Sequence, residues 1–163
     1  MVIISAARIV EARVDKVWEI VSDVDRDQEY WIGLGSIRNL RRGVNVVERE
    51  VTVGFIGRTS TQRIELKPKE SVELKMTRGP LKGNREITLT PLGGGERTMV
   101  DVSWNFEFSG VPAFAHEFVR SQVERATKAA LTMIEAAAKE GNQTLVGRAN
   151  GGKRRPKPSP AGA

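Results

Sequence analysis

The chain has 163 residues and a formal net charge of +6 at pH 7. This length predicts one domain with a single hydrophobic core. Cysteine is absent, which excludes disulfides, thiolate metal sites and cysteine nucleophiles. Before Arg8 the N-terminus has no basic leader and only a few apolar residues, so we expect neither a signal peptide nor a membrane span, and a cytoplasmic location.

The positive charge is concentrated at the C-terminus. Residues 141–163 hold five basic residues and no acidic one, which leaves 21 of the 26 basic residues in residues 1–140 against all 20 acidic residues. The expected domain over residues 1–140 is therefore nearly neutral, and no basic groove for nucleic acid is implied on it.

The tail over residues 141–163 is rich in Gly, Pro, Ala and basic residues, so we expect it to be disordered. A solubilising role is the simpler interpretation of such a terminus. Weak contact with RNA, an acidic lipid surface or a protein partner is the alternative.

The chain begins with a predicted strand and two short helices. Alternating β-branched residues predict a strand over residues 2–11, and apolar residues at helical spacing predict a helix over residues 14–22. Asp25 and Gln28 have the spacing of a capping box, which predicts a second short helix over residues 25–31.

Six further strands are expected, divided by turns that contain Gly, Pro or Asn. Their predicted ranges are residues 36–42, 45–53, 58–67, 71–78, 84–91 and 97–108. Connections this short imply antiparallel hairpins.

One long helix is expected over residues 112–139. Mostly small side chains recur along it at steps of three and four residues and define one stripe: Ala115, Val119, Gln122, Ala126, Ala130, Met133 and Ala137. Charged residues occupy the opposite side, so one face is expected to pack and the other to meet water. The element order β-α-α-β6-α predicts an α+β fold, in which a curved antiparallel seven-stranded sheet wraps around the long C-terminal helix.

Three polar residues occupy positions whose side chains are expected to point inward together with those of apolar neighbours. Alternation places Arg49 and Gln62 on the inner face of their strands, and Gln122 lies on the helix stripe. Because a buried polar group without a partner costs roughly 1 to 3 kcal/mol, we expect water, mutual hydrogen bonds or a ligand between sheet and helix. The alternative is that a bulge turns Arg49 outward, or that Gln62 lies near a strand end that is accessible to water.

The small helix residues face large side chains of the sheet, such as Met76, Trp104 and Phe106. This pairing predicts a cavity for a small molecule partway along the helix. The alternative is that the alanine stripe lets the helix pack tightly on the sheet.

No catalytic or metal-binding constellation is evident. His116 is the only histidine and has no acid or base partner in its sequence neighbourhood, so it is interpreted as structural or solvated. The acidic residues Asp23, Asp25, Asp27 and Glu29 are interpreted as a solvated face. We therefore expect no metal and no cofactor.

The layout resembles the START-like helix-grip (SRPBCC) superfamily, and within it the polyketide cyclase/dehydrase and coenzyme-Q-binding branch. The motifs that carry the resemblance span residues 2–140 and include Val17-Trp18, Ser22-Asp23-Val24, Tyr30-Trp31, Val53-Gly54-Phe55-Ile56-Gly57 and Gly79-Pro80-Leu81. The resemblance implies a hydrophobic cavity between the sheet and the last helix that binds lipids, isoprenoid quinones, sterols or polyketides. It also implies that Trp31 lies near the cavity entrance, with Phe55 and Ile56 at the tip of a hairpin. That tip either packs on a neighbouring element or acts as a gate or membrane contact.

Three functional hypotheses follow. The first is non-catalytic binding or transport of a hydrophobic small molecule such as a lipid, an isoprenoid quinone or a polyketide-like compound. Its predicted ligand-binding residues are Trp31, Arg49, Gln62, Ile64, Met76, Trp104, Phe106, Phe118, Gln122 and Ala126. The second is a polyketide cyclase or aromatase, in which Arg49 and a nearby hydroxyl stabilise an enolate. The third is a protein- or RNA-interaction module.

Overall fold

A computed structural model describes the backbone of residues 1–151 and the side chains of residues 1–140. The predicted tail from residue 152 onward lies outside the described residues. Three short 3-10 helices are labelled η. In chain order the elements are β1 (Val2–Val10), α1 (Val14–Val21), η1 (Val24–Glu29), β2 (Leu34–Arg42), β3 (Val46–Val53), β4 (Arg58–Lys67), β5 (Ser71–Arg78), β6 (Leu81–Leu92), η2 (Gly93–Gly95), β7 (Arg97–Phe108), η3 (Ala113–Ala115) and α2 (His116–Gly151).

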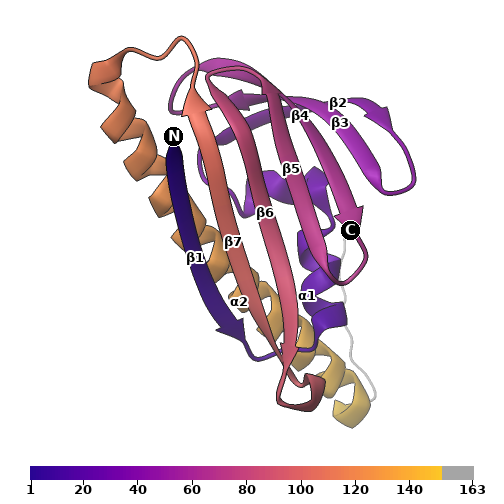
Figure 1. The fold of residues 1–163 in the computed structure, drawn as a ribbon. Helices are drawn as coiled ribbons and strands as arrows, with labels where there is room; N and C mark the ends of the chain where they lie inside the picture. The colour runs from indigo at the N-terminus through magenta and orange to yellow at the C-terminus, as the bar shows by residue number, and fades with distance from the viewer. Residues whose placement is uncertain (152–163) are drawn as a thin grey trace, which may run out of the picture.

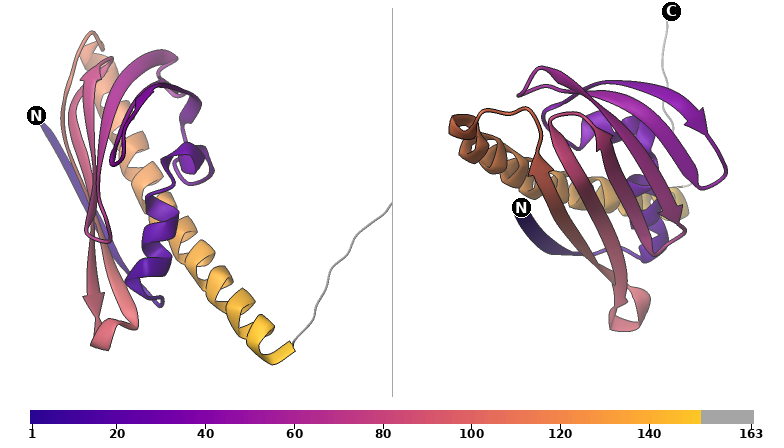
Figure 2. Two further views of the ribbon diagram at one scale, coloured as in Figure 1. Left: turned by 90° about the vertical axis from the view of Figure 1, so that its right-hand side faces the viewer. Right: turned by 45° about the horizontal axis from the view of Figure 1, so that its top comes forward.

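The seven strands form one antiparallel sheet in the order β1-β7-β6-β5-β4-β3-β2. Figure 1 shows the curved sheet with α2 running obliquely across it. In the side view of Figure 2, α1, η1 and α2 all lie on the same side of the sheet. The α+β helix-grip arrangement predicted from the element order is therefore confirmed.

The strand predictions are largely confirmed, and the main difference lies at the start of β6. β4, β5 and β7 have the predicted bounds, whereas β6 begins at Leu81 instead of residue 84. Gly83 lies inside β6 rather than in a turn, because β7 approaches it so closely that a Cβ there would overlap the carbonyl oxygen of Asn105.

The predicted capping box is wrong. The second short helix is the 3-10 helix η1, and its N-terminal cap makes no side-chain hydrogen bond. The carboxylate of Asp25 instead accepts hydrogen bonds from Asn39 (3.0 Å) and Arg42 (2.6 Å) of β2. Hydrogen bonds to an amide and a guanidinium of β2 therefore replace the local cap.

The long helix is rotated from its predicted orientation. α2 begins at His116, after the turn η3, and continues to Gly151 instead of ending at Lys139. Within residues 116–140 of α2, the buried residues are Val119, Val123, Ala126, Thr127, Ala130, Leu131, Ile134 and Ala138. Gln122 is only half-buried and Met133 is 37% exposed, because the rotation turns the larger branched side chains Leu131 and Ile134 into the core.

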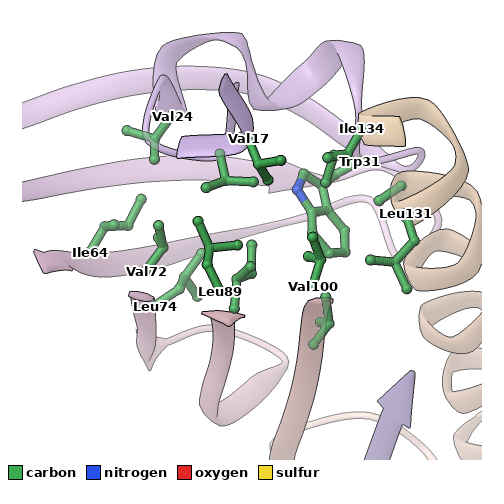
Figure 3. Packing of buried hydrophobic residues seen from close by; sticks show 14 of the residues in the cluster. Val17, Val24, Trp31, Ile64, Val72, Leu74, Leu89, Val100, Leu131 and Ile134 are labelled. Atoms are coloured by element: carbon green, nitrogen blue, oxygen red, sulfur yellow. The ribbon is translucent and has the colours of Figure 1, made fainter. Parts of the chain in front are cut away.

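The core lies between the sheet and the three helices on its inner side. Figure 3 shows side chains from α1, the strands and α2, among them Val17, Val100 and Leu131, gathered around Trp31. Trp31 lies in the segment between η1 and β2. Toward the hairpin between β3 and β4, this packing gives way to a cavity.

Candidate functional site

A cavity of about 70 Å³ lies between the sheet and α2 and is partly open to solvent. A single buried water needs roughly 10–15 Å³ by the same measure, so the space holds several waters or a small polar group. Its apolar walls include Trp31, Leu74, Met76, Leu81 and Trp104. The cavity is smaller than the roughly 300–1,000 Å³ typical of ligand pockets, so a larger ligand requires its walls to move.

Seven of the predicted site residues line this cavity: Trp31, Arg49, Phe55, Gln62, Met76, Trp104 and Ala126. Ile64 and Phe106 do not, since both are buried in the filled part of the core. Ile56 packs half-buried against the core with Phe55, so the hairpin tip rests on a neighbouring element. The roles of these residues in ligand binding remain predictions.

Two expected placements on α2 are wrong. Phe118 is 55% exposed, and neither Phe118 nor Gln122 lines the cavity. Val123 and Ala126 form the helical wall instead, because the rotation of α2 moves the inward face by about one residue. The polar contribution expected from Gln122 is therefore absent from the lining.

Arg49 is fully buried, and its three guanidinium nitrogens all have partners. Its Nε donates to Gln62 Oε1 (2.9 Å), its Nη1 to the carbonyl oxygen of Val24 (2.8 Å) and its Nη2 to Asp27 Oδ2 (2.8 Å). These bonds connect η1 to the inner face of β3 and β4. The inward placement of Arg49 and Gln62 is confirmed, and of the outcomes expected there, mutual hydrogen bonding is the one observed.

Asp27 belongs to the buried hydrogen-bonded cluster around Arg49. The interpretation of Asp27 as part of a solvated face is therefore wrong. Its side chain is buried and pairs with Arg49. Burial raises the pKa of Asp27, while the charges of Arg85 and Arg49 oppose the rise. The pattern of alternating acidic residues does not predict Arg49 as the partner of Asp27, because Arg49 lies 22 residues later in the chain, on β3.

Arg85 of β6 is a second buried cation, and sequence reasoning did not single it out. It is 3% exposed and lines the cavity. Its Cζ lies 4.3 Å from the ring centroid of Trp31 and 5.7 Å from that of Trp104, so the guanidinium rests on aromatic faces. Its Nε is buried and has no protein acceptor.

The signal for Arg85 was present in the sequence. Arg85 shares the alternation phase of Ile87 and Leu89, which are both buried in the same strand. Burial lowers the pKa of Arg85 to about 10, against the opposing effect of Asp27. Arg85 is therefore still a cation at neutral pH.

The aromatic wall is held by side-chain contacts across the core. Trp31 and Trp104 meet edge to face, with ring centroids 6.0 Å apart. Trp104 Nε1 donates to Thr127 Oγ1 of α2 (2.8 Å), and Thr127 Oγ1 donates to the carbonyl oxygen of Val123 (2.7 Å). Ser60 Oγ, also on the lining, is buried and has no protein partner.

The remaining candidate chemistry lies away from the cavity. A ring nitrogen of His116 is 2.8 Å from the carbonyl oxygen of Val111, and the ring stacks on Phe108, which agrees with the structural interpretation. Within residues 1–140, no three His, Asp or Glu side chains are grouped so that they could hold a metal ion. In the described part of the chain no helix is both long and apolar enough to cross a membrane.

A known protein family matches most of the chain. A sequence model of the family described as polyketide cyclase / dehydrase and lipid transport matches residues 1–139. A comparison with curated protein sequences gives no match.

Solved structures share the fold at low sequence identity. A protein from Thermus thermophilus is 15% identical, with a TM-score of 0.73 over 86% of this chain and 99% of that one. The Zhui aromatase/cyclase from a Streptomyces species is 17% identical, with a TM-score of 0.68 over 91% of this chain and 98% of that one. A START superfamily protein from Mycobacterium smegmatis is 16% identical, with a TM-score of 0.60 over 88% and 98% of the two chains. The START-like resemblance seen in the sequence is thus confirmed at the level of the fold.

Proposed function

Because the chain belongs to the polyketide cyclase / dehydrase and lipid transport family, we propose that it binds an apolar small molecule in the cavity between the sheet and α2. The observation that carries the proposal is the cavity itself, a space walled by two indole rings beside a densely packed core. Protein interiors contain few voids larger than a water molecule, so a void of this size with aromatic walls supports the proposed binding site.

The entrance proposed for the ligand lies where the segment before β2 meets the hairpin between β3 and β4. Ile32, Gly33, Leu34 and Phe55 line the cavity there. Gly33 has a φ of +94°, and a Cβ on it would lie 2.6 Å from the Phe55 ring. The ring therefore rests directly on the glycine backbone. Swinging Phe55 away enlarges the opening without disturbing a strand pairing.

The cyclase alternative has weaker support from the geometry. In that hypothesis Arg49 stabilises an enolate, but its guanidinium nitrogens are already engaged by Gln62, Val24 and Asp27. Binding without catalysis remains the better-supported function. For the interaction-module alternative, the comparisons give no support for nucleic-acid contact through the tail.

A ligand panel tests the proposal. Native mass spectrometry and thermal shift are measured with fatty acids, isoprenoid quinones and aromatic polyketides. We expect at least one class to bind and raise the Tm, since a ligand at 100 times its Kd stabilises the folded state by about 2.7 kcal/mol. If every class fails to bind, the proposed function is wrong.

A pair of identical substitutions locates the ligand. Ala126→Leu adds apolar volume to the cavity wall, whereas Ala136→Leu places the same side chain on an exposed position of α2. Ala126→Leu is expected to reduce affinity at least about tenfold by filling the space, while Ala136→Leu keeps it. Equal affinities of the two variants would place the ligand outside the cavity.

A further inference from the structure

The cavity wall carries an unbalanced positive charge. Arg49 and Arg85 are both buried and both line the cavity, and Asp27 is the carboxylate whose charge acts on both. Asp27 forms its hydrogen bond and ion pair with Arg49. Among the described residues, these three groups leave a net charge of +1 in a low-dielectric region, where an uncompensated charge is costly.

Arg85 is the member of the cluster whose donors are free. Its Nε has no protein acceptor, and its guanidinium lies on Trp31 and Trp104. The aromatic faces attract the cation but leave the N–H groups at the edge of the guanidinium plane without acceptors. Water entering the cavity can accept hydrogen bonds from these groups, but it does not neutralise the charge.

The ligand is therefore expected to supply the missing anion. We propose that the cavity selects apolar molecules that carry a carboxylate, and that Arg85 binds this carboxylate as an ion pair. The inference rests on the proposed function and names its ligand class. A guanidinium offers paired donors that match the two oxygens of a carboxylate, and the apolar remainder of the ligand then meets the aromatic wall.

Isosteric acid and ketone pairs test this selectivity. Decanoate is compared with 2-undecanone, and 2-naphthoate with 2-acetylnaphthalene, so that each pair differs in charge and hardly in shape. The two pairs distinguish aliphatic from aromatic acids as the source of the carboxylate. Isothermal titration at pH 7.5 is expected to show that the wild-type protein prefers the acid in at least one pair by roughly tenfold or more.

Arg85→Gln removes the charge from the cavity, and Lys82→Gln removes one from an exposed position of the same strand. We expect Arg85→Gln to lose the preference for the acid while still binding the ketone, which also shows that the variant is folded. Lys82→Gln should keep the preference.

The outcomes separate this inference from the proposed function. If the wild-type protein binds ketone and acid equally, or Arg85→Gln keeps the wild-type preference, the inference is overturned and the proposed function stands. If the ligand panel and all four probes fail to bind, both are overturned.

A pH profile provides a second readout that does not depend on the folding of Arg85→Gln. The ionisable groups whose charges act on Arg85 are Asp27 from η1 and Arg49 from β3. Since burial lowers the pKa of Arg85 to about 10, decanoate affinity should be level near neutral pH and decrease as the pH rises through about 10. Arg85→Lys should lose affinity at a lower pH, because lysine starts from a lower pKa of about 10.4. Decanoate affinity that is flat in both proteins up to about pH 11 contradicts the inference, and 2-undecanone serves as the uncharged control.

Discussion

At the scale of single residues, the site contains two buried arginines with different environments. Arg49 donates to a carboxylate, an amide oxygen and a backbone carbonyl, so its charge and its donors are both satisfied. Arg85 has aromatic rings on its face and no protein acceptor at Nε. The first arrangement is typical of a structural ion pair, and the second of a group kept available for a ligand.

Replacing each arginine by methionine should show this difference in stability. Arg49→Met leaves Asp27 buried without its ion-pair partner and is expected to lower the free energy of unfolding by about 3–5 kcal/mol. Arg85→Met replaces an unbalanced buried charge by a shorter apolar chain, so it should leave the free energy of unfolding unchanged or raise it. Urea denaturation followed by circular dichroism measures both. A loss for Arg85→Met comparable to that for Arg49→Met would contradict this assignment of roles.

At the scale of elements, the cavity depends on how α2 is held against β7. Trp104 in β7 donates its indole N–H to Thr127 in α2, and Thr127 is fully buried. This hydrogen bond positions a cavity-lining tryptophan relative to the helix that closes the cavity. The α2 face that carries Thr127 also carries Val123 and Ala126 of the lining, so the contact helps to set the rotation of the helix.

Thr127→Val tests this contact because it removes the acceptor and keeps the shape. It leaves the indole N–H of Trp104 without its partner and is expected to lower the free energy of unfolding by about 1–3 kcal/mol. Thr132→Val is the matched control, since Thr132 is exposed on the same helix and bonds only to the Lys128 carbonyl. The control should change stability by less than about 0.5 kcal/mol. Equal effects in urea denaturation would show that the Trp104 contact contributes little.

At the scale of the whole molecule, one curved sheet and the helices on its inner side enclose both a filled core and a cavity. Among residues 1–140, whose side chains are described, the core residues lie between Ile4 and Ala138, and the family match covers residues 1–139.

Because the family match covers residues 1–139, we expect removal of residues 152–163 to leave the fold and the cavity unchanged. The truncation deletes four basic residues, namely Lys153, Arg154, Arg155 and Lys157. We expect the Tm to stay within about 2 °C of the full chain, because the family match ends at residue 139, before the deleted segment. Differential scanning calorimetry gives the Tm, and ligand affinity serves as the check on the cavity. A decrease of more than about 5 °C would mean that the segment contributes to the folded domain.

Local patterns were sufficient to predict the order and type of the elements. The bounds of β4, β5 and β7 agree with the sequence prediction, because side-chain alternation and turn residues act over a few neighbouring positions. The same alternation placed Arg49 and Gln62 inside. This alternation also places Arg85 on the inner face, where the structure buries it, although an arginine at such a position is usually assumed to be exposed.

The pairing of the buried charges was decided by the tertiary structure. The hydrogen-bond partners of Arg49 lie 13, 22 and 25 residues away, and no periodicity relates them. The rotation of α2, which exchanges Gln122 for Val123 on the cavity wall, likewise depends on contacts with β1, α1 and β7 together. Periodicity identifies which residues share a face, whereas the satisfaction of a buried charge depends on which distant groups the complete fold brings within hydrogen-bonding distance.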